Sequence, residues 1–127
     1  VEVSPDNPIA LSNYGLCLIE LGRFEDARKA FTRALELEPR PSVYTNLGHS
    51  LMMEGRLAEA IEPFRKALES NSSSHLYHAN YGSALLWSNT DRAKALEHYR
   101  RAAELAETDR AQDPRNARLL ANVSGYY

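Results

Sequence analysis

Apolar and small residues recur along this chain with the spacing of an α-helix. One stripe, at positions i, i+3, i+4 and i+7, consists of Leu11, Tyr14, Gly15 and Leu18. A second stripe of the same kind consists of Ala27, Phe31 and Ala34. Gly22 lies between the stripes, where a residue with positive φ ends a helix without a Cβ clash. The pattern predicts two helices joined by a tight turn.

The whole pattern then repeats after 33 residues. When segment 8–40 is aligned with segment 41–73, eleven of the 33 residue pairs are identical. A third copy follows 34 to 35 residues later, with matching residues Asn80, Gly82, Leu85, Ala95, Tyr99 and Ala102. Such a period is typical of solenoids made of stacked helix pairs, whereas a plain helical bundle needs no fixed period. We therefore expect an all-α solenoid of antiparallel helix pairs.

Small residues in the stripes predict that the two helices of a pair approach closely. We expect this role for Gly15, Gly48 and Gly82, and we expect the space between pairs to be filled by Phe31, Phe64 and Tyr99. The third copy has Asn89 where the others have glycine, and asparagine also tolerates the left-handed conformation. The helix turns are thus predicted for all three copies.

Pro63 conflicts with the local pattern, because it lies in the middle of a predicted helix. Proline there normally costs about 3 kcal/mol. The repeat register outweighs this penalty, so we expect a bend rather than a break. The equivalent residues are Ala30 and His98, from which we expect an outward-facing position.

These features make the chain resemble the tetratricopeptide repeat family. The resemblance rests on the Leu-Tyr-Gly-Leu and Tyr-Leu-Gly-Leu stripes, the glycine that follows each, the Ala-Phe-Ala stripe and the closing proline. It extends over nearly the whole chain. The resemblance implies a right-handed superhelix whose concave groove is lined mainly by the first helix of each pair.

The repeats divide the chain into five expected parts. They are the tail of a preceding repeat at 1–7, repeats at 8–40, 41–74 and 75–113, and the first helix of an incomplete repeat at 114–127. The stretch after Leu105 exceeds the family spacing, so the last complete repeat should have a second helix extended to near Ala111. Neither end shows a polar cap, which indicates a fragment of a longer array. The extended helix also weakly resembles the repeat tails of large bacterial signalling proteins.

The charge of the chain argues against nucleic-acid binding. The net charge is −2 with a pI near 6.1, and no basic stripe is present. No apolar run approaches the roughly 20 residues that span a bilayer, so membrane insertion is not expected. Cys17 is the single cysteine and cannot form an internal disulfide. A cytoplasmic location is expected, with a periplasmic one left open.

No residue set indicates catalysis or a cofactor. His75 and His78 have a spacing that could hold a metal, but no cysteine or carboxylate is placed to complete the set. We interpret them as exposed residues at a helix start. Cys17 neighbours a packing stripe and is expected to be a small buried residue rather than a nucleophile. We expect no enzymatic activity, no cofactor and no metal site.

The asparagines of the first helices are the informative polar residues. One register, offset from the apolar stripe, contains Asn13, Asn46, Asn80 and Asn122. An amide both donates and accepts hydrogen bonds, so these residues could bind the backbone of an extended peptide. The alternative is that asparagine belongs to the structural consensus of the repeat. The same face is predicted to contain Leu16, Glu20, His49, Met53, Ser83 and Trp87.

One turn earlier on this face lie Ile9, Ser42, Leu76 and Arg118, of which the first three are not basic. Repeat domains that clamp a peptide's terminal carboxylate have Lys or Arg at such positions, so the resemblance does not extend to that activity. We instead expect a scaffold that binds an extended peptide or partner segment, with Trp87 and Met53 as apolar anchors. The alternatives are a structural spacer, self-association through exposed repeat ends, and a substrate-docking arm of a multidomain enzyme.

Overall fold

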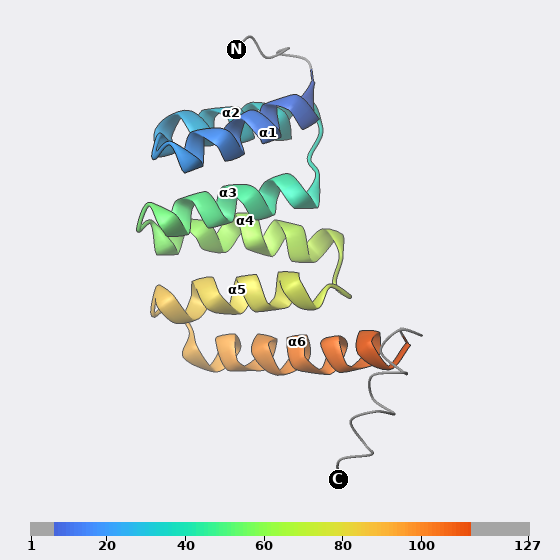
Figure 1. Cartoon of the computed structure of the whole chain (residues 1–127). Helices are drawn as coiled ribbons and strands as arrows, with labels where there is room; N and C mark the ends of the chain where they lie inside the picture. The colour runs from blue at the N-terminus through green and yellow to red at the C-terminus, as the bar shows by residue number, and fades with distance from the viewer. Residues whose placement is uncertain (1–6, 113–127) are drawn as a thin grey trace, which may run out of the picture.

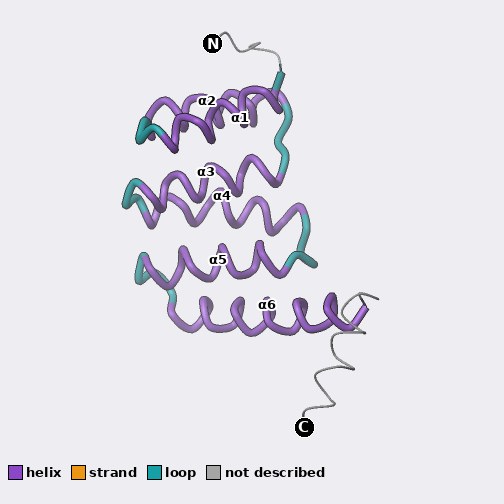
Figure 2. Tube along the Cα trace, in the orientation of Figure 1, coloured by secondary structure: helices purple, strands orange, loops and turns teal. Residues whose placement is uncertain are grey.

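The structure, a computed structural model, describes residues 7–112 and contains six helices and no strand within that range. In chain order the helices are α1 (Pro8–Glu20), α2 (Phe24–Leu37), α3 (Pro41–Met53), α4 (Leu57–Ser70), α5 (His75–Trp87) and α6 (Arg92–Gln112). They stack one after another along the chain (Figure 1) and are joined by short loops (Figure 2). The predicted all-α solenoid of helix pairs is confirmed.

The stack curves toward its first helices. Each helix packs on the next one in the chain, both within a pair and between pairs. In addition α1 approaches α3 and α3 approaches α5, whereas α2 does not approach α4 and α4 does not approach α6. The first helices therefore lie closer together than the second helices, and the side formed by α1, α3 and α5 is the concave one.

The turns inside the pairs have the left-handed residues that the sequence predicts. Gly22 and Gly55 have φ values of +76° and +86°, and Asn89 has +56°. Nothing lies within 4 Å of the position of a Cβ at either glycine, so conformation rather than space selects glycine there. In each case the next residue donates its backbone N–H to a carbonyl near the end of the first helix.

Each of the first two helix pairs has one buried aromatic residue between its two helices. Phe31 and Phe64 are fully buried. A Cβ atom on Gly15 would lie 2.6 Å from the ring of Phe31, and one on Gly48 would lie 2.6 Å from the ring of Phe64. Glycine at these positions thus lets each first helix lie directly on an aromatic ring of its partner helix, so the two rings pack within their own pairs, whereas the sequence pattern predicts them between pairs.

Side-chain contacts also join the first pair to the second. Asn46 of α3 donates its amide N–H to the hydroxyl oxygen of Ser12 on α1 at 3.2 Å. Arg28 of α2 forms a 3.3 Å ion pair with Glu54, the residue that follows α3, and both side chains are largely buried. Neighbouring pairs are therefore linked by polar contacts as well as by apolar packing.

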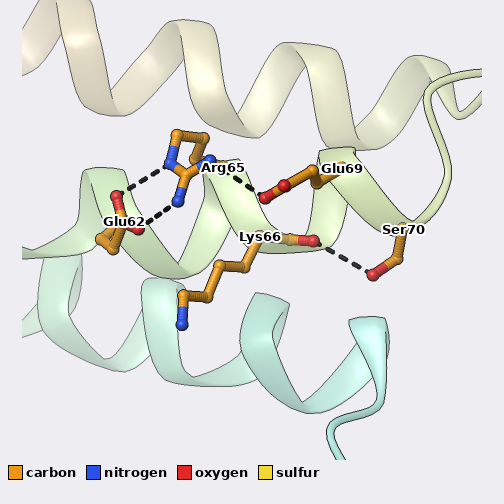
Figure 3. A network of polar contacts seen from close by, with 5 residues as sticks. All are labelled: Glu62, Arg65, Lys66, Glu69 and Ser70. Carbon is orange, nitrogen blue, oxygen red and sulfur yellow. Dashed lines mark hydrogen bonds and ion pairs between the residues drawn. The ribbon is translucent and has the colours of Figure 1, made fainter.

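The exposed side of α4 carries charges that pair within the helix. Arg65 binds Glu62 one turn before it and Glu69 one turn after it, each with a nitrogen-to-oxygen distance of 2.9 Å (Figure 3). Ser70 donates its hydroxyl to the backbone oxygen of Lys66, also in Figure 3. Pairs of this kind, three and four residues apart, stabilise an exposed helix surface by a few tenths of a kcal/mol each. The charges on this side of α4 are therefore paired within the helix itself.

The sequence predictions about the exposure of Pro63 and Cys17 are wrong. Pro63 does not face outward, because it is buried within a continuous α4. Ala30, which has the same position in the first repeat, is buried in one cluster with Val43 of α3. The position thus faces the next helix pair. Cys17 is exposed rather than buried. Its equivalents Ser50 and Ala84 are fully buried, and the difference arises because no described helix packs against α1 from the preceding side.

The last described helix is long. α6 has 21 residues, compared with 14 for α2 and α4, so the stretch after Leu105 is helical. The predicted first helix of a fourth repeat, with Asn122, lies outside the described residues. The repeat end expected to promote self-association lies there as well.

Candidate functional site

The concave side presents an exposed face of α1, α3 and α5, which we call the groove face. It consists of the residues that the sequence places in one register and its neighbouring turns: Ile9, Asn13, Leu16 and Glu20 of α1, Ser42, Asn46, His49 and Met53 of α3, and Leu76, Asn80, Ser83 and Trp87 of α5. All of them are exposed or half-buried, so the structure brings the predicted residues of the described chain onto one accessible surface.

The groove face is rich in large apolar side chains that are exposed to solvent. Trp87 is 65% exposed, Met53 62% and Leu76 61%, and Ile9 and Leu16 follow at 52% and 41%. Single exposed apolar residues are normal on a protein surface, but several gathered on one face indicate an interaction site.

The three asparagines of the groove face differ in what they bind. The amide of Asn46 is engaged with Ser12 and links two repeats. Within residues 7–112 the structure shows no side-chain hydrogen bond for Asn13 or Asn80, of which the first is exposed and the second half-buried. A structural role therefore fits Asn46, while the other two amides remain available to a ligand.

Two further groove residues also have internal partners. The Ser83 hydroxyl lies 2.7 Å from the hydroxyl of Tyr99 on α6. The His49 imidazole packs edge-on against the Phe64 ring, with ring centroids 5.2 Å apart. Partial burial of this imidazole lowers the pKa of His49 below its ordinary value. At neutral pH His49 is therefore an uncharged polar group of the groove face.

The groove face is almost free of charge. Helices α1, α3 and α5 contain no Lys or Arg, and Glu20 is their one carboxylate. The charges of the described chain lie on the second helices and loops, where many of them pair with each other. A ligand on this face meets amides, apolar side chains and one acid, but no cation from the helices that line it.

A shallow cavity adjoins Trp87, the most exposed apolar residue of the groove face. It has a volume of about 410 Å³ and lies between Trp87 and the start of α4. Its wall contains Gly55, Leu57 and Ala58 together with the charged side chains of Arg56 and Glu59, which pair with each other. The space above Gly55 is open. The indole of Trp87 therefore has room beside it for another apolar side chain.

The prediction that His75 and His78 are exposed residues at a helix start is wrong for His78. His78 is 7% exposed and contacts His98 of α6, whereas His75 is half-buried. The sequence contained a signal for this, because His78 shares the register of Leu11 in the first apolar stripe. Across the described residues, no three His, Cys, Asp or Glu side chains come together as a metal site would require.

The chain is similar in sequence to a known repeat family. The model of a family described as tetratricopeptide repeat matches residues 1–39 and 15–75. No curated protein matches the chain. Among the helices that the structure describes, none is both long enough and apolar enough to cross a membrane.

Solved structures show the same fold. A crystal structure of MamA superposes with a TM-score of 0.77 at 20% identity, covering 84% of this chain and 62% of that one. A structure of MamA from MSR-1 gives 0.72 at 26% identity, covering 84% and 61%. This chain thus spans about three-fifths of the MamA chains that it matches.

Further similar structures come from a protein named RPAP3. The first TPR of Spaghetti (RPAP3), bound to the HSP90 peptide SRMEEVD, gives a TM-score of 0.73 at 19% identity, covering 99% of this chain and 97% of that one. The first TPR domain of human RPAP3 gives 0.73 at 20% identity, covering 96% and 93%. At these identities the likeness shows the fold alone.

Proposed function

We propose that this chain is a protein-interaction scaffold within a longer protein. The premise is that the chain belongs to the tetratricopeptide repeat family and has its right-handed superhelical fold. Its groove face binds an extended segment of a partner protein. The observation that supports this most is the alignment of Ile9, Leu16, Met53, Leu76 and Trp87 on the concave side, all exposed.

The segment is held in two ways. The free amides of Asn13 and Asn80 bind its backbone, which requires no particular sequence. Trp87 and Met53 take apolar side chains, with the cavity beside Trp87 as the main anchor site. Exposed aromatic residues beside a pocket are the usual source of binding energy in an interface.

The groove face has no Lys or Arg, and this specifies the kind of segment. The peptide SRMEEVD in the similar RPAP3 structure is acidic. Here Ile9, Ser42 and Leu76 stand one turn before the asparagines, and none is basic. An acidic tail would lose hydration without gaining a cationic partner. The groove face therefore selects an uncharged or weakly basic segment with apolar side chains.

A peptide screen tests this function. Arrays of extended peptides, varied in apolar content and in charge, are probed with the protein, and hits are measured by fluorescence polarisation of labelled peptide. Apolar, non-acidic peptides should bind, and Trp87→Ala should weaken them by about tenfold or more. Leu96→Ala is the matched control, since Leu96 is an exposed apolar residue of α6 away from the groove face.

Two outcomes would overturn the proposal. If no peptide binds while the protein is folded, the array is better explained as a structural spacer. If peptides bind equally well to the Trp87→Ala and Leu96→Ala variants, the interaction surface lies elsewhere.

A further inference from the structure

Two histidines face each other where α5 and α6 meet. His78 of α5 and His98 of α6 have their Nδ1 atoms 3.0 Å apart. Their ring centroids are 5.2 Å apart and the rings are inclined by 26°. The distance between the ring centroids exceeds the distance between the Nδ1 atoms by about two ring radii. The two Nδ1 atoms therefore point at each other. This is the geometry of a hydrogen bond with one proton between two nitrogens.

A backbone carbonyl determines which nitrogen has the proton. The other ring nitrogen of His78, Nε2, lies 2.8 Å from the oxygen of Ser72 in the loop before α5. A carbonyl oxygen only accepts, so Nε2 of His78 donates and its Nδ1 has no hydrogen. Nδ1 of His98 must then donate to Nδ1 of His78, which leaves Nε2 of His98 as a free acceptor.

The pair can accept one further proton but not two. One extra proton leaves one of the two facing nitrogens as an acceptor, so the bond between the rings stays intact. A second would put an N–H on both facing nitrogens, which lie 3.0 Å apart. Two donors and two positive charges would then face each other without an acceptor, so the contact between the rings disfavours the doubly charged pair.

The surroundings of the pair add charges of both signs. A cavity of about 300 Å³ gives solvent access to the rings, and its wall also contains Glu97, Arg100, Arg101 and Glu104 of α6. Tyr81 of α5 contacts the His98 ring edge-on, and His75 lies one turn before His78. Burial, the charge of His78 and Lys94 lower the pKa of His98, while Glu97 opposes the change.

We propose that the His78–His98 pair is an acid-sensitive latch that holds α6 against α5 and opens when both imidazoles are protonated. Folding disfavours the doubly charged pair, so the unfolded chain binds more protons as the pH falls. The contribution to stability is complete well above the ordinary imidazole pKa of about 6.5 and is lost progressively below it.

The same geometry argues against a metal as the natural occupant. A metal bonded to both nitrogens would sit to one side of the line that joins them, at a bent angle. The rings would have to turn away from their present alignment. A shared proton needs no such movement.

Two experiments on the described chain test the latch. Histidine NMR of the wild type should show the Nε2–H tautomer of His78 at neutral pH. The Nδ1–H tautomer of His78 would overturn the proposal without any variant.

Urea unfolding at pH 7 and pH 5 gives the energetic test. His98→Asn keeps an amide N–H near the position of Nδ1 but cannot be charged. The equilibrium constant for folding should fall more in the wild type than in this variant when the pH is lowered. The difference should be about tenfold for each unit by which folding lowers the pKa of His98. His75→Asn is the control and should behave like the wild type. Equal losses in the wild type and His98→Asn would contradict the latch.

Discussion

A Cβ atom on Gly48 would lie 2.6 Å from Cε1 of Phe64, a separation that real Cβ atoms essentially never show. The Phe64 ring is fully buried and cannot move into solvent. Gly48→Ala should therefore destabilise the array by about 1–2 kcal/mol, because overpacking outweighs the better helix propensity of alanine. Urea unfolding measures this change.

The third repeat supplies a matched control for that substitution. At Gly82 the nearest atom is the backbone oxygen of Ala95 at 3.1 Å, and the Tyr99 ring is 3.6 Å away. Gly82→Ala should thus cost clearly less than Gly48→Ala. Equal costs would mean that the aromatic contact does not explain glycine at these positions.

Removal of the buried Phe64 ring tests the same contact. Phe64→Ala should cost about 3–5 kcal/mol. Stability in a repeat array is close to a sum of repeat and neighbour terms, so loss in the middle pair should also broaden the unfolding transition. An unchanged urea midpoint would contradict the packing described here. Leu96→Ala, at an exposed position of α6, should change stability by less than about 0.5 kcal/mol.

Pro63 interrupts the hydrogen bonding of an otherwise continuous α4, and its ring is buried. Pro63→Ala restores a backbone donor and removes the clash of a proline ring with the preceding turn, at the expense of some buried apolar surface. The net result should be a gain of about 1–2 kcal/mol, measured by thermal or urea unfolding. A loss of stability would show that the ring contributes packing that alanine cannot replace.

Periodicity predicts the fold well because the repeat averages over local irregularities. Three copies identify the helices, their pairing and the left-handed turns at Gly22, Gly55 and Asn89. The errors come from neighbours that periodicity does not reveal. Cys17 has the register of buried residues but lies on a helix with no described helix before it, and Pro63 was assigned outward although its register faces the next pair.

The groove face was only partly predictable. Its register and exposure follow from helical spacing, which places Trp87 and Met53 on one side. The bond from Asn46 to Ser12 depends on how α1 and α3 approach each other and on side-chain rotamers, and sequence spacing determines neither. The same holds for the contact between His78 and His98, which are twenty residues apart on different helices.

Acid should weaken the fold through His49 as well as through the histidine pair. Burial against the core lowers the pKa of His49, so the unfolded chain binds the proton more readily. The stability contribution is complete above the ordinary imidazole pKa of about 6.5 and is lost as the pH falls below it. Unfolding at several pH values should show His49→Gln with a smaller acid loss than the wild type. An identical pH dependence would mean that the imidazole is freely solvated.

The asparagines of the groove face should separate into structural and binding residues. Asn46→Ala removes the partly buried bond to Ser12 and should cost about 0.5–1.5 kcal/mol of stability. Asn80→Ala removes an amide with no described side-chain partner, so stability should stay nearly unchanged while peptide affinity falls by about two- to tenfold. Urea unfolding and fluorescence polarisation on the same two variants measure both quantities. If Asn80→Ala unfolds the protein, or leaves the affinity of a groove-binding peptide unchanged, asparagine in this register belongs to the repeat's structure, and the ligand backbone is held by other groups.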